Sequence, residues 1–126
     1  QPTLLYLYGL EKFSDAIESS TIPVENIRCP ILIISGEDDK LWPSTLYGNL
    51  VIERLEKKGS TIERKHIHFS GAGHLFELPY VPSAPRPYYH PVVKLWCTMG
   101  GTAEGNARAG KESWSETLSF LKQYLQ

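Results

Sequence analysis

The chain has 126 residues, with 13 Lys and Arg against 14 Asp and Glu, and its formal net charge at pH 7 is −1. Hydrophobic residues make up 41% and charged residues 21%, which excludes a disordered chain and is typical of a single globular domain. The balanced charge excludes the basic surface that nucleic-acid binding requires. The apolar runs are far shorter than the roughly 20 residues that span a bilayer. The start at Gln1-Pro2, without Met, predicts a piece cut from a longer protein.

Residues 1–28 are predicted to form a connecting segment. The first ten residues are too apolar for a free tail, so we expect them to pack against a larger body, and the following stretch is mostly polar. The clearest strand comes next, where Cys29-Pro30 precedes the β-branched run from Ile31 to Ile34 and a closing Gly36. An apolar run without alternation indicates burial on both faces, as in a central parallel strand.

A helix is predicted behind Ser44, which is a plausible N-cap, and Gly59 is expected to end it as the C′ glycine. Residues 62–69 alternate between polar and apolar side chains, which predicts a second strand nearer the edge of the sheet. Residues 75–100 hold five prolines interleaved with tyrosines, so we expect a long Pro-rich loop without regular structure and with a functional role.

Thr102 is predicted to cap a final helix. Small and apolar side chains recur along it at helical spacing and predict the stripe that packs on the sheet, namely Ala103, Ala107, Gly110, Trp114, Leu118, Leu121 and Leu125. Residues 29–126 thus form a βαβα unit, and the fold class is α/β with parallel strands. Because two buried strands do not make an independent sheet, we expect the C-terminal part of a larger domain with an incomplete sheet.

Two short polar stretches follow the two strands, at the sheet end where open α/β sheets place their ligands. Asp39 lies in the first stretch and His74 lies in the second, 35 residues later, among glycines. An acid followed by a histidine, each in a loop after a strand, predicts an Asp–His relay in which Asp39 orients the imidazole of His74. Taken singly, Asp39 is equally consistent with a turn aspartate and His74 with a loop histidine, so the pair carries the prediction.

The sequence resembles the family of bile acid-CoA:amino acid N-acyltransferase and the related acyl-CoA thioesterases, which are α/β-hydrolases. The resemblance rests on the strand with its Gly-x-x-Asp from Ile31 to Asp39, the Gly-x-Gly-His from Gly71 to His74, and the stretch from His74 to Pro82, followed by Gly100-Gly101 and a helix with Trp114. It implies that Asp39 is the triad acid and His74 the triad base. Asp38 is the weaker candidate for the acid because Gly36-x-x-Asp39 sets the register.

The resemblance implies that an earlier Ser or Cys attacks an acyl-CoA thioester, and that water or an amino acid such as glycine or taurine then takes the acyl group. No serine or cysteine upstream of Asp39 has glycines at both flanking second positions, so the nucleophile elbow lies outside this chain. No cofactor is expected. The location predicted for the intact enzyme is intracellular and cytoplasmic, with peroxisomes and mitochondria as alternatives.

Weaker expectations concern the walls of the site and metal binding. Trp42 and Tyr80 are predicted to line the substrate pocket, although Trp42 equally fits a hydrophobic staple for the helix that follows it. His66 and His68 share one strand face, but no third ligand has suitable spacing, so no metal site is predicted.

Two alternatives to the acyl-CoA enzyme stay open. One is another serine hydrolase, such as a dienelactone-hydrolase-like enzyme, and the other is a non-catalytic fragment that self-associates. Because the strand Ile31–Ile34 lacks an earlier neighbour, we expect a homo-oligomer held together at this edge and at residues 1–10.

Overall fold

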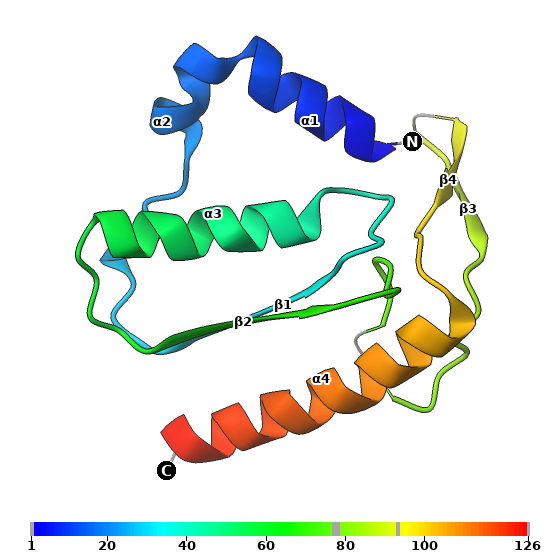
Figure 1. Cartoon of the computed structure of the whole chain (residues 1–126). Helices are drawn as coiled ribbons and strands as arrows, with labels where there is room; N and C mark the ends of the chain where they lie inside the picture. The colour runs from blue at the N-terminus through cyan, green and yellow to red at the C-terminus, as the bar shows by residue number, and fades with distance from the viewer. Residues whose placement is uncertain (1, 77–78, 93, 126) are drawn as a thin grey trace.

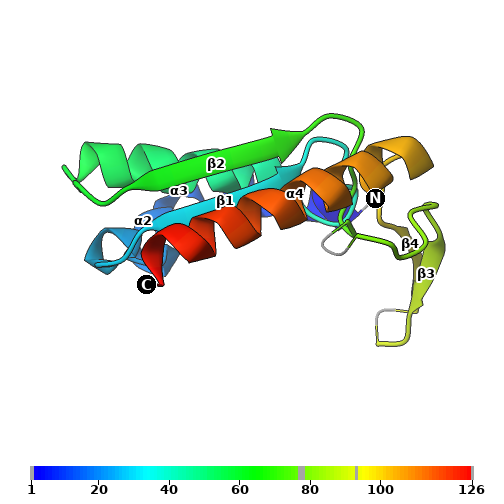
Figure 2. The ribbon, with the colours of Figure 1, turned by 90° about the horizontal axis from the view of Figure 1, so that it is seen from below.

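Two parallel strands lie at the centre of the structure, between two long helices. The computed structural model describes residues 2–76, 79–92 and 94–125. Strand β1 (Ile31–Gly36) pairs with β2 (Arg64–Phe69) in parallel, with Ile31 opposite Arg64 and Gly36 opposite Phe69. Helix α3 (Ser44–Lys57) covers one face of this sheet and α4 (Ala103–Tyr124) covers the other (Figures 1 and 2). The predicted α/β class and parallel pairing are confirmed.

The N-terminal segment is more regular than the sequence pattern predicts. It forms α1 (Pro2–Lys12), the 3₁₀ turn η1 (Ser14–Ala16), α2 (Ile17–Ser20) and a second 3₁₀ turn η2 (Val24–Asn26). Helix α1 lies on the outer side of α3, away from the sheet (Figure 1). Arg54 of α3 fastens the segment, since its Nε donates to Glu25 Oε2 at 2.7 Å. Hydrogen bonding to Arg54 lowers the pKa of Glu25 to about 2.

The Pro-rich region contains a β-hairpin. Strand β3 (Pro87–His90) pairs with β4 (Leu95–Thr98) in antiparallel fashion, with Pro87 opposite Thr98. The prediction that residues 75–100 form no regular element is therefore wrong for the hairpin. Proline is tolerated at the first residue of an edge strand, where no ladder hydrogen bond needs its missing N–H. Residues 77–78 and 93 of the predicted loop lie outside the described residues.

The helix ends agree with the sequence signals at two of three positions. Thr102 caps α4, because its hydroxyl accepts a hydrogen bond from Gly105 N–H at 2.9 Å. Gly59 has φ of 67° and follows the C-cap Lys58, as a C′ glycine does. The predicted N-cap at Ser44 is wrong, since Ser44 is the first helical residue and its hydroxyl donates to the carbonyl oxygen of Gly36 at 3.2 Å.

Helix α4 packs through a face that neighbours the predicted stripe. The buried residues on this helix are small or polar, namely Gly105, Asn106, Ala109, Gly110 and Ser113. Of the predicted stripe only Gly110 is buried, while Leu118, Leu121 and Leu125 are exposed. The absence of a side chain at Gly105 is required, because a Cβ there would overlap the carbonyl oxygen of Gly71. The core against this face comprises Phe69, Ala72, Phe76 and Ala109, with Ile34 and Ile67 beside it.

The sheet is small and open. Within the described residues β1 pairs with β2 alone, so the edge of β1 that faces away from β2 has no partner strand. Many large apolar side chains are exposed on α1 and α4, among them Leu5, Tyr8, Leu118 and Leu125. In the part of the chain that the structure covers, no helix combines the length and apolar character needed to cross a membrane.

Candidate active site

Two loops meet at the carboxyl ends of the parallel strands. The acid loop (residues 37–43) follows β1 and the histidine loop (residues 70–74) follows β2. Their backbones are joined, since Glu37 N–H donates to Phe69 O at 3.1 Å and Asp38 N–H donates to Ala72 O at 2.9 Å. The parallel pairing of β1 and β2 thus brings together two segments that are far apart in the sequence.

Asp39 and His74 form a hydrogen-bonded pair at this junction. His74 Nδ1 lies 3.0 Å from Asp39 Oδ2, and the side chains are 21% and 3% exposed, respectively. Because a carboxylate only accepts hydrogen bonds, Nδ1 is the donor, and in the neutral ring Nε2 then carries the lone pair. The other oxygen, Oδ1, accepts hydrogen bonds from the backbone N–H groups of Leu41 at 2.8 Å and Trp42 at 3.1 Å. Each carboxylate oxygen of Asp39 therefore has a separate role.

A cavity of about 410 Å³ adjoins the pair. It is bounded by the end of β1, both loops and the middle of α4, through Ile34, Ser35, Gly36, Asp39, Trp42, Ser44, His74, Phe76, Ser113, Trp114 and Thr117. The ring of Trp42 meets the imidazole of His74 edge-on, with centroids 5.2 Å apart. The structure thus places Trp42 in the wall of this cavity, and its role in a substrate pocket stays a prediction. Tyr80 is fully exposed and is not among the residues that bound this cavity, so its role in a substrate pocket stays a prediction.

A third segment, the Gly100–Gly101 turn that precedes α4, fastens both loops. His74 N–H donates to Met99 O at 2.7 Å, and Gly101 N–H donates to Asp38 Oδ2 at 2.9 Å. Both glycines have positive φ, at 74° and 78°, which side chains with a Cβ rarely adopt. Asp38 also pairs with Lys40, and these two contacts, the lysine first, lower the pKa of Asp38. Asp38 is therefore engaged with this turn while Asp39 contacts His74.

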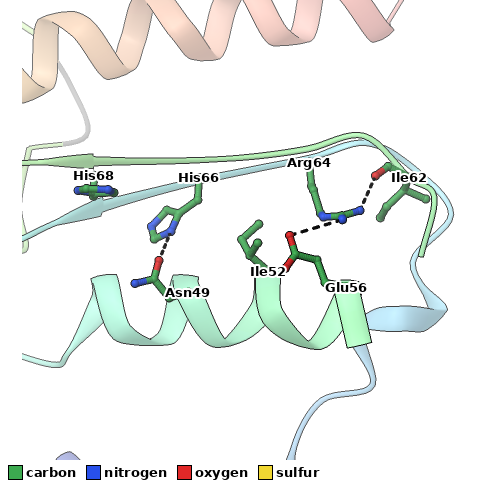
Figure 3. A pocket seen from close by; sticks show the side chains of 7 residues that line it. All are labelled: Asn49, Ile52, Glu56, Ile62, Arg64, His66 and His68. Carbon is green, nitrogen blue, oxygen red and sulfur yellow. Dashed lines mark hydrogen bonds and ion pairs between the residues drawn. The ribbon is translucent and has the colours of Figure 1, made fainter. Parts of the chain in front are cut away.

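The two strand histidines face α3, on the other side of the sheet, where a cavity of about 550 Å³ opens between α3 and β2 (Figure 3). His66 Nε2 lies 2.8 Å from Ser35 Oγ, and its Nδ1 lies 3.0 Å from Asn49 Oδ1. Burial, and secondarily His68, lowers the pKa of His66. His68 pairs with Glu37 at 2.5 Å. Among the described residues no three His, Cys, Asp or Glu side chains gather as metal ligands would.

One polar residue near the pair has no counterpart among the sequence predictions. Asn106 is 5% exposed in the first turns of α4, and its Oδ1 accepts a hydrogen bond from Gly73 N–H at 2.8 Å. In the sequence, Asn106 stands out only as a polar residue among glycines and alanines on a helix that packs closely. This pattern indicates a buried polar group but does not identify its hydrogen-bond partner.

Comparison with known proteins identifies relatives along nearly the whole chain. A family model described as BAAT / Acyl-CoA thioester hydrolase C terminal matches residues 4–126. The chain is 34% identical to peroxisomal succinyl-coenzyme A thioesterase of Mus musculus, over 84% of this chain and 25% of that protein. It is 32% identical to acyl-coenzyme A amino acid N-acyltransferase 2 of Mus musculus, over 97% of this chain and 29% of that protein. The chain is also 32% identical to bile acid-CoA:amino acid N-acyltransferase of Mus musculus, over 91% of this chain and 27% of that protein. The chain thus spans little more than a quarter of the length of these relatives.

Proposed function

This chain belongs to the BAAT / acyl-CoA thioester hydrolase C-terminal family, and on that premise we propose that it supplies the acid and base of an enzyme acting on acyl-CoA thioesters. Asp39 is the acid and His74 is the base. The observation that carries the proposal is the 3.0 Å contact between His74 Nδ1 and the buried carboxylate of Asp39, beside an open cavity. The relatives support the substrate class, because their names are those of acyl-CoA thioesterases and amino acid N-acyltransferases.

In the proposed reaction, His74 Nε2 removes the proton of a Ser or Cys nucleophile, which attacks the thioester carbonyl carbon. The protonated imidazole then gives this proton to the departing CoA thiolate, and an acyl-enzyme remains. Asp39 holds the imidazole in the tautomer that this step requires and stabilises its charged form. Water completes a thioesterase cycle, whereas glycine or taurine completes a transferase cycle.

The nucleophile is proposed to belong to polypeptide outside these 126 residues. In an α/β-hydrolase fold the order along the chain is nucleophile, acid, then histidine, so the elbow and the oxyanion hole precede β1. The strand edge of β1 that lacks a partner among the described residues is where a preceding strand would pair. For the intact enzyme we propose a cytoplasmic location, with the peroxisome, which one relative's name specifies, as the alternative.

The test is an assay of the intact enzyme that contains this chain, following release of the CoA thiol from acyl-CoA of several chain lengths. We expect Asp39→Asn to lower kcat by about 10⁴-fold and His74→Ala to lower it by about 10⁶-fold, as in other triads. His68→Gln is the matched control, because His68 pairs with Glu37 on the other face of the sheet and should leave turnover unchanged. Retention of a tenth or more of the activity in His74→Ala would contradict the proposal. Adding glycine or taurine and identifying the product distinguishes transfer from hydrolysis.

A further inference from the structure

Asn106 bridges two distant segments from within α4. Its Oδ1 accepts a hydrogen bond from Gly73 N–H at 2.8 Å, and its Nδ2 donates to Ser83 O at 3.0 Å. The side chain is 5% exposed, and both its amide oxygen and its amide nitrogen are used. Gly73 directly precedes His74, so the contact lies one residue from the proposed base. Asn106 itself does not line the cavity beside His74.

The histidine loop is attached to the segment 99–106 by three hydrogen bonds. Two use backbone atoms alone, from Thr102 N–H to Gly71 O at 2.9 Å and from His74 N–H to Met99 O at 2.7 Å. The third is the bond from Gly73 N–H to Asn106, and it is the one of the three that a side chain makes. Substitution cannot remove the backbone bonds. Arg108 of α4 also donates to Ser70 O at 2.7 Å at the start of the loop, so Asn106 is the side chain that holds the loop next to His74.

The backbone around Asn106 packs closely. A Cβ on Gly101 would overlap Asn106 Oδ1, and a Cβ on Gly73 would overlap the backbone of Gly100. If the amide were absent, the Gly73 N–H would be left without its partner in a closely packed turn, and a buried donor without a partner is destabilising. The loop would relieve that cost by shifting, and His74 would shift with it.

We propose that Asn106 is a positioning residue that sets His74 at hydrogen-bonding distance from Asp39. The proposal rests on the proposed function in so far as the position of His74 matters for turnover. Asn106 acts through the backbone of Gly73 and does not touch substrate. The oxygen of its side chain is the essential atom, and the bond to Ser83 is secondary.

The primary test uses the intact enzyme that contains this chain and a readout that does not depend on activity. Nitrogen-15 NMR of the His74 ring reports whether Nδ1 carries the proton, and the solvent exchange of that proton reports the bond to Asp39. In Asn106→Ala we expect the exchange to accelerate at least tenfold at a temperature where circular dichroism shows a folded protein. Asn106→Asp retains an oxygen acceptor for Gly73 N–H, so it should keep the slow exchange of the unsubstituted chain.

Leu55→Val is the control for general destabilisation, because Leu55 is fully buried on α3, and α3 covers the face of the sheet opposite α4. It should lower the Tm without changing the exchange of the His74 proton. If Asn106→Ala does not fold, Asn106→Ser carries the test, since its hydroxyl is too short to reach Gly73. Unchanged exchange in the Ala or Ser variant, or equal acceleration in Asn106→Asp, would overturn the proposal.

Kinetics of the intact enzyme separate this inference from the proposed function. We expect Asn106→Ala to lower kcat by about 10²-fold at unchanged KM, as small misplacements of catalytic groups do, and Asn106→Asp to restore it. If His74→Ala leaves turnover intact, the proposed function fails, whereas the NMR result still decides whether Asn106 positions His74. If the His74 proton is indifferent to Asn106, the inference fails although the proposed function stands.

Discussion

Substitution of Asp39 by Asn and by Ala separates the two roles that its carboxylate oxygens have in the structure. Oδ1 accepts the backbone N–H groups of Leu41 and Trp42, and Oδ2 accepts the Nδ1–H of His74. Asparagine forms the same kind of turn as aspartate, so Asp39→Asn keeps the first role and loses only the second. Asp39→Ala loses both.

The expected magnitudes follow from the three hydrogen bonds to this carboxylate. A hydrogen bond to a charged group contributes about 1.5–3 kcal/mol, and we take the lower end because water reaches Trp42. Asp39→Asn should lower the free energy of unfolding by about 1.5 kcal/mol, and Asp39→Ala, which loses all three bonds, should lower it by about 4.5 kcal/mol. The two N–H donors of the turn keep the Asn oxygen on their side, so its NH₂ group faces the imidazole. We therefore expect His74 in Asp39→Asn to change to the tautomer with the proton on Nε2.

The assay is urea unfolding followed by circular dichroism, together with nitrogen-15 NMR of the His74 ring. Asp15→Asn and Asp15→Ala are the matched controls, because Asp15 is exposed in the turn η1 and should change the free energy of unfolding by less than about 0.5 kcal/mol. If Asp39→Asn is as stable as the unsubstituted chain and the His74 tautomer is unchanged, Asp39 is a turn aspartate and nothing more, and our interpretation of the pair is wrong.

Four further outcomes are expected. Gly100→Ala should lower the free energy of unfolding by more than about 2 kcal/mol, because φ is positive there and the added Cβ would overlap the carbonyl group of Asp38. Gly59 also has positive φ but lies in open space, so Gly59→Ala should lower the free energy of unfolding by only about 1 kcal/mol in the same urea titration. The chain alone should hydrolyse acyl-CoA at the background rate in a thiol-release assay, and turnover abolished by His74→Ala would reveal a nucleophile within it. Sedimentation at tens of micromolar (~10⁻⁵ M) should show a dimer or larger species held at the Ile31–Ile34 edge and residues 1–10, and a well-behaved monomer would refute this. The pKa of Glu25 is lowered from 4.5 to about 2, so its contribution to stability is present above pH 4.5 and is lost as the pH falls toward 2. In Glu25→Gln the free energy of unfolding should therefore depend less on pH over that interval.

The parts of the fold that the sequence predicts are those with a local cause. The β-branched run before Gly36 predicts β1, and the hydroxyl of Thr102 together with the positive-φ Gly59 marks two helix ends. The pairing of Asp39 with His74 is predictable because both residues follow parallel strands, whose carboxyl ends share one edge of the sheet. Neighbouring residues mark the strand and the helix ends, and the parallel pairing of β1 and β2 brings the acid and the histidine together.

The features that the sequence pattern misses depend on contacts between residues far apart in the sequence, or on segments whose apolar residues show no periodic spacing. Helix α1 has apolar residues on every side, with Leu4, Leu5 and Tyr8 all exposed, so no amphipathic period marks it. The buried face of α4 is set by the close approach of Gly105 to Gly71, which favours small residues over the bulky stripe ending at Leu125. The role of Asn106 depends on a partner 33 residues away, and no local signal specifies that partner.

The attachment of both loops to the Gly100–Gly101 turn has a consequence for the order of events during synthesis. The acid loop and the histidine loop leave the ribosome before this turn does, yet Asp38 and the backbone of His74 acquire these partners only when the turn arrives. Bringing residues 38 and 101 together closes a long stretch of chain, whose entropic cost grows only slowly with length. A nascent chain that ends before this turn can join its two loops to each other, but it lacks the partners that the turn supplies to Asp38 and to the backbone of His74.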